Sequence, residues 1–215
     1  HEFPPLSVIN NDILRLRFAL YSPMKYILPH KQAFYHEKYD TKVANGRVLK
    51  QTDRENNLVY LMKTNLLKRL ESSVYSFSLT LQSIIEQIDA HLSKIENEAT
   101  NIGDFDNIDM EDDEMEEAFV GAKVKIALRD IDRIRWKQDL LYDRTILQKL
   151  LDYASQVTPE RDQKMLTLKK MIQQKIAHPI NGQNKKILIF TAFADTAKYL
   201  YEHLHRWIRQ EFHLH

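Results

Sequence analysis

The chain has 215 residues, of which 43% are hydrophobic, enough to bury the core of one domain or two small ones. It contains no cysteine, which excludes disulfides and thiolate metal sites, and no apolar run reaches the roughly 18–20 residues of a membrane span. We therefore expect a soluble cytoplasmic protein without a membrane partner. The net charge of +1 conceals ten acidic residues between Glu98 and Glu117, a stretch without lysine or arginine, so the rest of the chain is basic.

Turn-forming residues are few, with four glycines and six prolines, which predicts a mostly α protein. We expect a helical segment over residues 1–52 and a long antiparallel helical hairpin over residues 53–156, with an acidic tip at 97–118. Residues 157–215 are expected to form a linker helix, then a single β-strand and a helix that begin an incomplete α/β lobe. Because the chain starts at His1 and ends just after a predicted helix, we expect it to be part of a longer protein.

The N-terminal elements are predicted from apolar spacing and from prolines. Apolar residues that a helix can gather on one side predict a helix over residues 6–21, which Ser22 and Pro23 end. An aromatic-rich segment at residues 26–39 is consistent with a short second helix. Residues 42–52 are predicted to be a loop.

The central hairpin is predicted from two amphipathic stripes. Apolar residues at steps of three and four predict a long helix over residues 53–98, which Ser72 and Ser73 would break if they form a cap. A second stripe predicts a partner helix over residues 124–156. The charged stretch between them is expected to form the solvated tip.

The C-terminal elements are predicted from start signals and from one buried-type strand. Thr158, Pro159 and Glu160 predict the start of a helix that runs to about residue 177. Residues 185–190 are predicted to form a strand covered on both faces, because four apolar residues follow one another there. Asp195 is the expected N-cap of a helix over residues 196–212. One parallel strand needs neighbours, which we expect beyond residue 215.

No complete catalytic or cofactor site is present in the sequence. The four glycines form no phosphate-binding loop, and a calcium loop starting at Asp104 fails because Ile108 and Asp109 stand where a ligand and a glycine are needed. The nine histidines lack the spacing of a metal site, and no serine lies in a glycine-flanked elbow. We expect no metal and no cofactor bound by this chain alone.

Six basic residues are candidates for a surface that faces phosphate groups. The plainer interpretation of these residues is a solvated helix face. The set comprises Lys63, Lys68, Arg69, Arg129, Arg133 and Arg135.

Two short segments resemble the Swi/Snf-type branch of the helicase-like, DNA-dependent ATPases of superfamily two. They are residues 66–73, with the sequence LLKRLESS, and residues 186–193, with the sequence KILIFTAF. In that family a basic helix of the first kind follows the first RecA-like motor lobe, and a strand of the second kind opens the second lobe. The order matches here, the helices between them resemble the family's helical protrusions and linker, and the resemblance extends over about residues 22–204.

The resemblance implies a role in a motor that tracks double-stranded DNA. The phosphate-binding loop, the acidic Mg-binding motif and the arginine finger of the family are absent, so ATP and Mg are expected to bind only in the longer protein. Many relatives carry glutamine where this chain has Ala192, so the resemblance does not extend to a side-chain contact there. The residues implied to contact nucleic acid are Lys68, Arg69, Ser72, Ser73, Thr191, Ala192 and Phe193.

Three functions follow from these observations. The first is a helical segment that couples two motor lobes and contacts the DNA backbone without being catalytic by itself. The second is an interaction module that binds a protein partner through the hairpin and its acidic tip at residues 97–118. The third is a structural spacer, since long helical pairs are often scaffolds.

Overall fold

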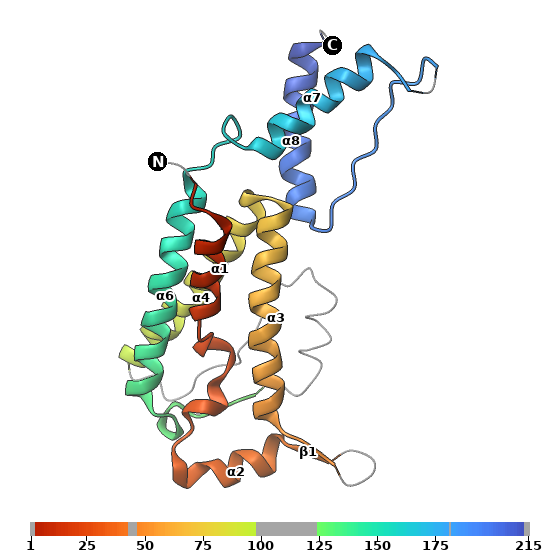
Figure 1. Cartoon of the computed structure of the whole chain (residues 1–215). Coiled ribbons are helices and arrows are strands. Elements are labelled where there is room, and N and C mark those ends of the chain that lie inside the picture. Colours follow the sequence, from red (N-terminus) through yellow and green to blue (C-terminus); the bar gives the residue numbers. More distant parts are fainter. Residues whose placement is uncertain (1–2, 43–46, 98–123, 181, 213–215) are drawn as a thin grey trace.

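The computed structural model describes residues 3–42, 47–97, 124–180 and 182–212. These residues are mostly helical, which confirms the predicted mostly α class, and they contain one two-stranded sheet. Helices α1, α3, α4 and α6 form an elongated body, with α2 and β1 at one end and α7 and α8 at the other (Figure 1). The predicted acidic tip at residues 97–118 lies, apart from Asn97, outside the described residues.

The predicted helix over residues 6–21 is too long. Helix α1 (Leu6–Arg15) ends early and is followed by two 3-10 turns, η1 (Ala19–Tyr21) and η2 (Pro23–Tyr26). The backbone of Phe18 has a φ of 50°, in the left-handed region that a right-handed helix cannot contain. The apolar spacing was therefore correct about the burial of Ile9, Ile13, Leu16 and Leu20, but Val8 is exposed and the predicted backbone was wrong.

A buried carboxylate from α6 (Arg133–Ser155) holds the turn around Phe18. Asp143 is 1% exposed and accepts the backbone N–H groups of Arg17 at 2.7 Å and Ala19 at 2.8 Å. Burial raises the pKa of Asp143 to about 6, although the two N–H donors oppose that rise. The acceptor comes from more than 120 residues away, so local spacing gave no sign of the turn.

Replacing Asp143 with alanine should lower the free energy of unfolding by roughly 2–4 kcal/mol, because two buried N–H donors lose their acceptor. Urea unfolding followed by circular dichroism measures the loss. Asp152→Ala, an exposed acid on the same helix, is the control and should cost under about 1 kcal/mol. Equal losses in the two variants would contradict the role of Asp143.

Helix α2 (Pro29–Tyr39) lies close to its predicted place, but the predicted loop over residues 42–52 contains a small hairpin. Strands β1 (Thr41–Lys42) and β2 (Val48–Leu49) pair antiparallel, with Thr41 opposite Leu49. Asp40 accepts the N–H of Gln51 at 2.8 Å, which ties the hairpin to the start of α3. The loop prediction missed two-residue strands because so short a run carries no alternation pattern.

The predicted long helix consists of two helices, α3 (Gln51–Ser72) and α4 (Val74–Glu96). Helix α4 packs along α6, and two ion pairs give their relative direction. Arg144 contacts Asp89 at 2.5 Å, and Lys137 contacts Glu96 at 2.9 Å. Residue numbers rise along α6 while they fall along α4, so the two helices run antiparallel.

Helix α6 begins later than the predicted residue 124 because the preceding segment pairs with the N-terminal region. Ile131 forms an antiparallel bridge with Ile27, and Asp132 donates its N–H to the carbonyl of Tyr26 at 2.8 Å. The 3-10 turn η4 (Leu128–Asp130) lies within this segment. The Asp132 side chain then accepts the N–H of Arg135 at 3.1 Å and caps the helix.

A single apolar core runs through the body. Trp136 is fully buried near its centre and donates its indole N–H to the carbonyl of Ala19 at 3.0 Å. A second, smaller core joins α7 and α8 through Met165, Ile172, Tyr199 and Leu204. Among the described residues, no helix combines the length and the apolar character that a membrane span requires.

Glu55 is a second buried carboxylate of the body. It lies in the second turn of α3, is 5% exposed, and its two oxygens accept the N–H of Met24 at 3.1 and 3.4 Å. Burial raises its pKa to about 8, against opposing effects of the Met24 N–H, Gln51 and Lys25. The folded protein therefore favours the protonated side chain.

The stability contributed by protonated Glu55 should be complete below about pH 4.5, the ordinary pKa, and lost as the pH rises to about 8. Glu55→Gln keeps an acceptor for Met24 but cannot ionise. Urea midpoints from about pH 5 to 8 should therefore fall in the unaltered chain relative to the variant, by up to about 1.4 kcal/mol per pH unit. Asp53→Asn, an exposed change two residues earlier, is the control, and parallel profiles for all three proteins would contradict this assignment.

The predicted helix start at Thr158 is wrong. Residues 158–161 form a turn, in which Asp162 donates its N–H to the carbonyl of Thr158 at 2.9 Å. Asp162 is the cap of α7 (Gln163–Ala177), because its carboxylate accepts the N–H groups of Lys164 at 2.9 Å and Met165 at 3.1 Å. An aspartate with two backbone donors outcompetes the threonine and proline signal upstream.

The predicted strand over residues 185–190 is absent from the described structure, where these residues are irregular. All six are exposed, and Leu188 and Phe190 are 83% and 90% exposed. A strand needs neighbours for its backbone N–H and carbonyl groups, and the described residues supply none here. The segment instead runs as a coil beside α7 toward α8 (Ala194–Glu211) (Figure 1).

Candidate functional site

The candidate site is the junction where α3, α4 and the start of α8 meet. Ser73 alone separates α3 from α4 and has an extended backbone, with φ −157° and ψ 147°. Its hydroxyl accepts the N–H of Ser76 at 3.0 Å, which caps α4. The LLKRLESS segment therefore ends one helix and begins the next, as serine capping allows.

Hydroxyl groups join this break to the KILIFTAF segment and the first turn of α8. Thr196 is 4% exposed, and its hydroxyl lies 2.8 Å from that of Ser72 and 3.0 Å from that of Ser73. The Ser72 hydroxyl is also 3.4 Å from that of Thr191. Segments almost 120 residues apart in the sequence are thus bonded directly to each other.

Arg69 lies at the centre of the junction and is 5% exposed. Its guanidinium donates to Asp195 at 3.2 Å, to Asn65 at 3.1 Å and to Ser76 at 3.3 Å. The same group stacks over the ring of Phe193, 4.7 Å from its centroid. These contacts satisfy the cation inside the protein, so Arg69 links two elements rather than presenting a charge to solvent.

The junction corrects the predicted start of α8. The helix begins at Ala194, Phe193 is its N-cap residue, and Asp195 lies in its first turn. Asp195 was expected to be the N-cap, but its carboxylate binds Arg69 instead. A negative charge in the first helical turn also interacts favourably with the helix dipole.

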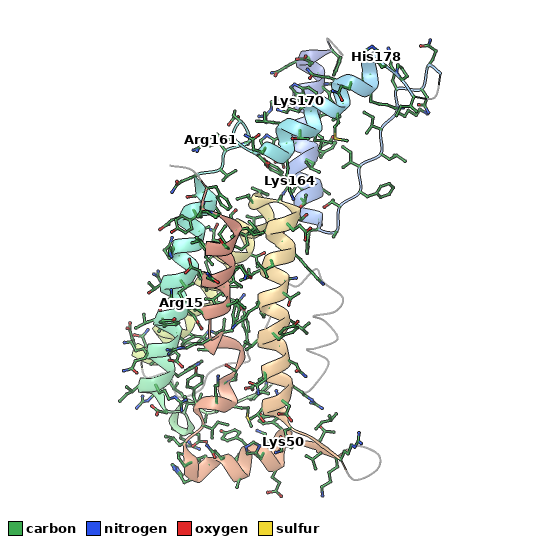
Figure 2. The ribbon with its side chains drawn as sticks, viewed as in Figure 1. Arg15, Lys50, Arg161, Lys164, Lys170 and His178 are labelled. Carbon is green, nitrogen blue, oxygen red and sulfur yellow. The ribbon has the colours of Figure 1, made fainter. Side chains whose placement is uncertain are left out.

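Further contacts around the junction connect α7 to α3, α4 and α8. Tyr75 of α4 stacks on Tyr199 of α8, with centroids 5.1 Å apart and planes at 14°. Tyr199 donates its hydroxyl to Asp162 at 3.0 Å, and burial together with Asp162 raises its pKa. Lys164, which lies where α7 begins above the end of α3 (Figure 2), donates to the carbonyl of Glu71.

The structure brings together most of the residues implied to contact nucleic acid. Arg69, Ser73 and Phe193 are buried in the junction, and Ser72 and Thr191 are half-buried in it. Lys68 and Ala192 are exposed beside it. The buried members therefore support the junction itself rather than a surface for a ligand.

Sequence reasoning missed several members of the junction. Asn65 and Ser76 contact the predicted residue Arg69, and their positions four residues before it and seven after it were a usable signal. Thr196 carried a weaker signal, its position three residues after the second segment. Tyr75 and Tyr199 carried none, because their stacking depends on how α4 meets α8.

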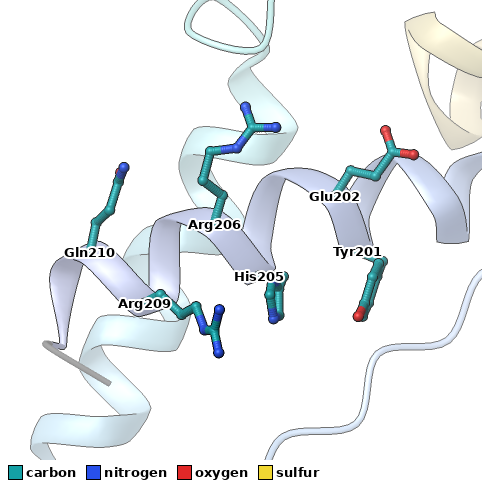
Figure 3. A pocket seen from close by; sticks show the side chains of 6 residues that line it. All are labelled: Tyr201, Glu202, His205, Arg206, Arg209 and Gln210. Atoms are coloured by element: carbon teal, nitrogen blue, oxygen red, sulfur yellow. The ribbon is translucent and has the colours of Figure 1, made fainter. Parts of the chain in front are cut away.

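The exposed side of α8 carries a shallow hollow, and all of its lining residues come from that one helix (Figure 3). Tyr201 and His205 stack with centroids 5.4 Å apart, beside Arg206 and Arg209. One helix face cannot enclose a small ligand, so we assign it no catalytic role. Among the described residues, no three histidine or carboxylate side chains are grouped to hold a metal ion.

Comparisons with known proteins add no assignment. The chain matches no family model. No curated protein and no solved structure shows significant similarity to it. What remains to indicate a function is the geometry of the junction and the resemblance of residues 66–73 and 186–193 to the Swi/Snf-type ATPases.

A double-mutant cycle should show that Arg69 and Asp195 stabilise the junction together. We expect Arg69→Ala and Asp195→Asn to have a coupling energy of about 0.5–3 kcal/mol, since each single variant already breaks the ion pair. Urea unfolding of the four proteins measures it, and hydrogen exchange in the first turns of α8 should rise in both variants. Strictly additive effects would show that the pair adds nothing. Glu202→Gln, an exposed change on α8, is the control.

Proposed function

We propose that this chain is the helical segment that couples the two lobes of an ATP-dependent helicase or translocase acting on double-stranded DNA. It is not catalytic by itself. The observation that carries the proposal is the junction, because the two segments that resemble the family contact each other across the fold, Ser72 with Thr191 and Arg69 with Phe193. Asp195 and Thr196, just after the second segment, add the ion pair and two further hydroxyl contacts. ATP and Mg would bind in the longer protein, in lobes on either side of this chain.

The contacts explain how such coupling would work. The body is an elongated helical unit, while α7 and α8 have a separate small core. The two are connected by the Arg69–Asp195 ion pair, the Ser72 and Ser73 contacts with Thr196, and the Tyr75–Tyr199 stack. A movement of the α8 side would therefore reach the α3–α4 break through a few directional bonds.

The proposal also includes two predicted fold features, the helical hairpin and the strand at residues 185–190. Antiparallel α4 and α6 would form the predicted hairpin that protrudes between the lobes. Residues 185–190 would become a strand when neighbouring strands of a second lobe cover them. The high exposure of Leu188 and Phe190 supports this, because apolar side chains in a row are normally buried.

The longer protein should hydrolyse ATP faster with double-stranded DNA than without it. Asp195→Asn should reduce this stimulation roughly ten-fold, because coupling free energies between sites are commonly 1–3 kcal/mol. Steady-state ATPase assays with and without DNA measure the ratio. Glu202→Gln is the matched control, an acid on the same helix that takes no part in the junction.

The two ways in which this experiment fails have different meanings. An unaltered longer protein that ignores DNA would overturn the proposed function itself. Equal stimulation in the Asp195→Asn and Glu202→Gln proteins would leave the DNA-dependent ATPase proposal standing. It would show that the junction does not couple the two lobes.

The alternative is an interaction module that binds a protein partner through the hairpin and its acidic tip. The charge of residues 98–117 supports it, since ten acids without a basic residue attract basic surfaces. Deleting residues 98–118 separates the two functions. Loss of a bound partner with intact DNA-stimulated ATPase would favour the interaction module.

A further inference from the structure

The buried junction takes Arg69 away from the DNA contact of the proposed function. Arg69 was expected to contact the DNA backbone, but its side chain is 7% exposed and bound to Asp195. Breaking that ion pair to reach a phosphate would leave the half-buried carboxylate of Asp195 without its counter-charge. The phosphate contacts must therefore come from other basic residues.

Positive charge is concentrated at the end of the body farthest from α7 and α8. Residues 25–54 carry seven lysines and arginines against three acids, and residues 124–137 carry five against two. The middle of the body, residues 55–97 and 138–156, has six against eight. One end of the molecule thus has a net charge of +7 on a chain whose total is +1.

The two basic segments lie side by side. Leu28 donates its N–H to the carbonyl of Asp130 at 2.9 Å, and Tyr39 donates its hydroxyl to the carbonyl of Lys125 at 2.8 Å. In Figure 1 they form the end that bears α2 and β1, and Lys50 marks it in Figure 2. We call the lysines and arginines of these two segments the distal basic surface.

Three of the five acids at this end are engaged in internal contacts, while Glu37 and Asp53 are exposed. Asp130 is buried and accepts the hydroxyl of Tyr35 at 2.9 Å. Asp132 caps α6, and Asp40 accepts the N–H of Gln51 at the start of α3. These three carboxylates point toward backbone and core groups, so the solvent side of this end is more positive than the sequence count suggests.

Several cations of the distal basic surface remain available to a ligand. Lys42, Lys50, Arg129 and Arg133 are exposed, and none of them forms an ion pair with another described residue. Arginine binds phosphate through two parallel N–H groups, which suits a sugar-phosphate backbone. The exposed apolar residues nearby are on separate elements, Phe34 on α2, Val48 and Leu49 on β2, and Ile134 on α6. Within the described part of this end, no single helix therefore presents an apolar face to a membrane.

We infer that the distal basic surface binds the phosphate backbone of double-stranded nucleic acid, without sequence preference. The inference rests on the proposed function for the identity of the polyanion. It moves the DNA contact from the junction to the opposite end of the body. The junction then transmits movement, and the distal surface holds the DNA.

The test uses this chain and a fluorescent duplex of about 30 base pairs, between about 50 and 200 mM salt. The variant Lys50→Gln/Arg129→Gln/Arg133→Gln should bind at least about ten-fold more weakly, with the slope of log K against log salt reduced by about 2–3. All three changes are on exposed side chains, and urea unfolding checks that the variant folds.

The matched control lies at the other basic end. Residues 157–212 carry ten lysines and arginines against five acids, and Lys170, Arg206 and Arg209 are exposed there. Lys170→Gln/Arg206→Gln/Arg209→Gln should change binding less than about two-fold, because these residues lie outside the proposed surface.

Three results would overturn the inference. They are equal losses in the two triple variants, no binding of the duplex by the chain, and tighter binding to vesicles of phosphatidylserine and phosphatidylcholine than to DNA. The outcome is separable from the ATPase test. Suppose that the distal variant loses DNA binding and that the longer protein hydrolyses no ATP. The inference about this surface would then stand, and the proposed function would be rejected.

Discussion

The buried guanidinium of Arg69 is the group on which the arrangement of this protein most depends. A buried cation is costly unless each of its donors finds a partner. Asn65 and Ser76 supply partners from either side of the α3–α4 break, and Asp195 supplies the counter-charge from α8. The break, the start of α8 and the coil that precedes it must therefore stay in register for the charge to remain satisfied.

Buried carboxylates perform the corresponding task inside the body. Asp143 holds the turn at Phe18, and Glu55 holds the turn at Met24, each through backbone N–H donors. At the distal end, Asp40, Asp130 and Asp132 serve as internal acceptors in the same way. Lysines and arginines are therefore most of the charges that face solvent there.

The two proposals assign different work to the two ends of the molecule. The junction is buried, hydrogen-bonded and directional, which suits the transmission of movement. The distal basic surface is exposed and carries mostly positive charge, which suits reversible contact with a polyanion. An elongated helical body between them would keep the DNA contact at a fixed distance from the point where α8 attaches.

The sequence alone determined the helical class, the two amphipathic stripes and the two segments that form the junction, because these depend on local spacing. The start at Gln163 was missed for a local reason, because Asp162 is a stronger cap than the threonine and proline upstream. The sequence did not determine the helix start at Arg133, the turn at Phe18 or the role of Arg69. Each of those depends on an acceptor or a backbone partner from a distant segment. The strand predicted at residues 185–190 failed for the same reason. Apolar content indicates that a segment tends to be buried, but a strand forms only where tertiary structure supplies neighbouring strands.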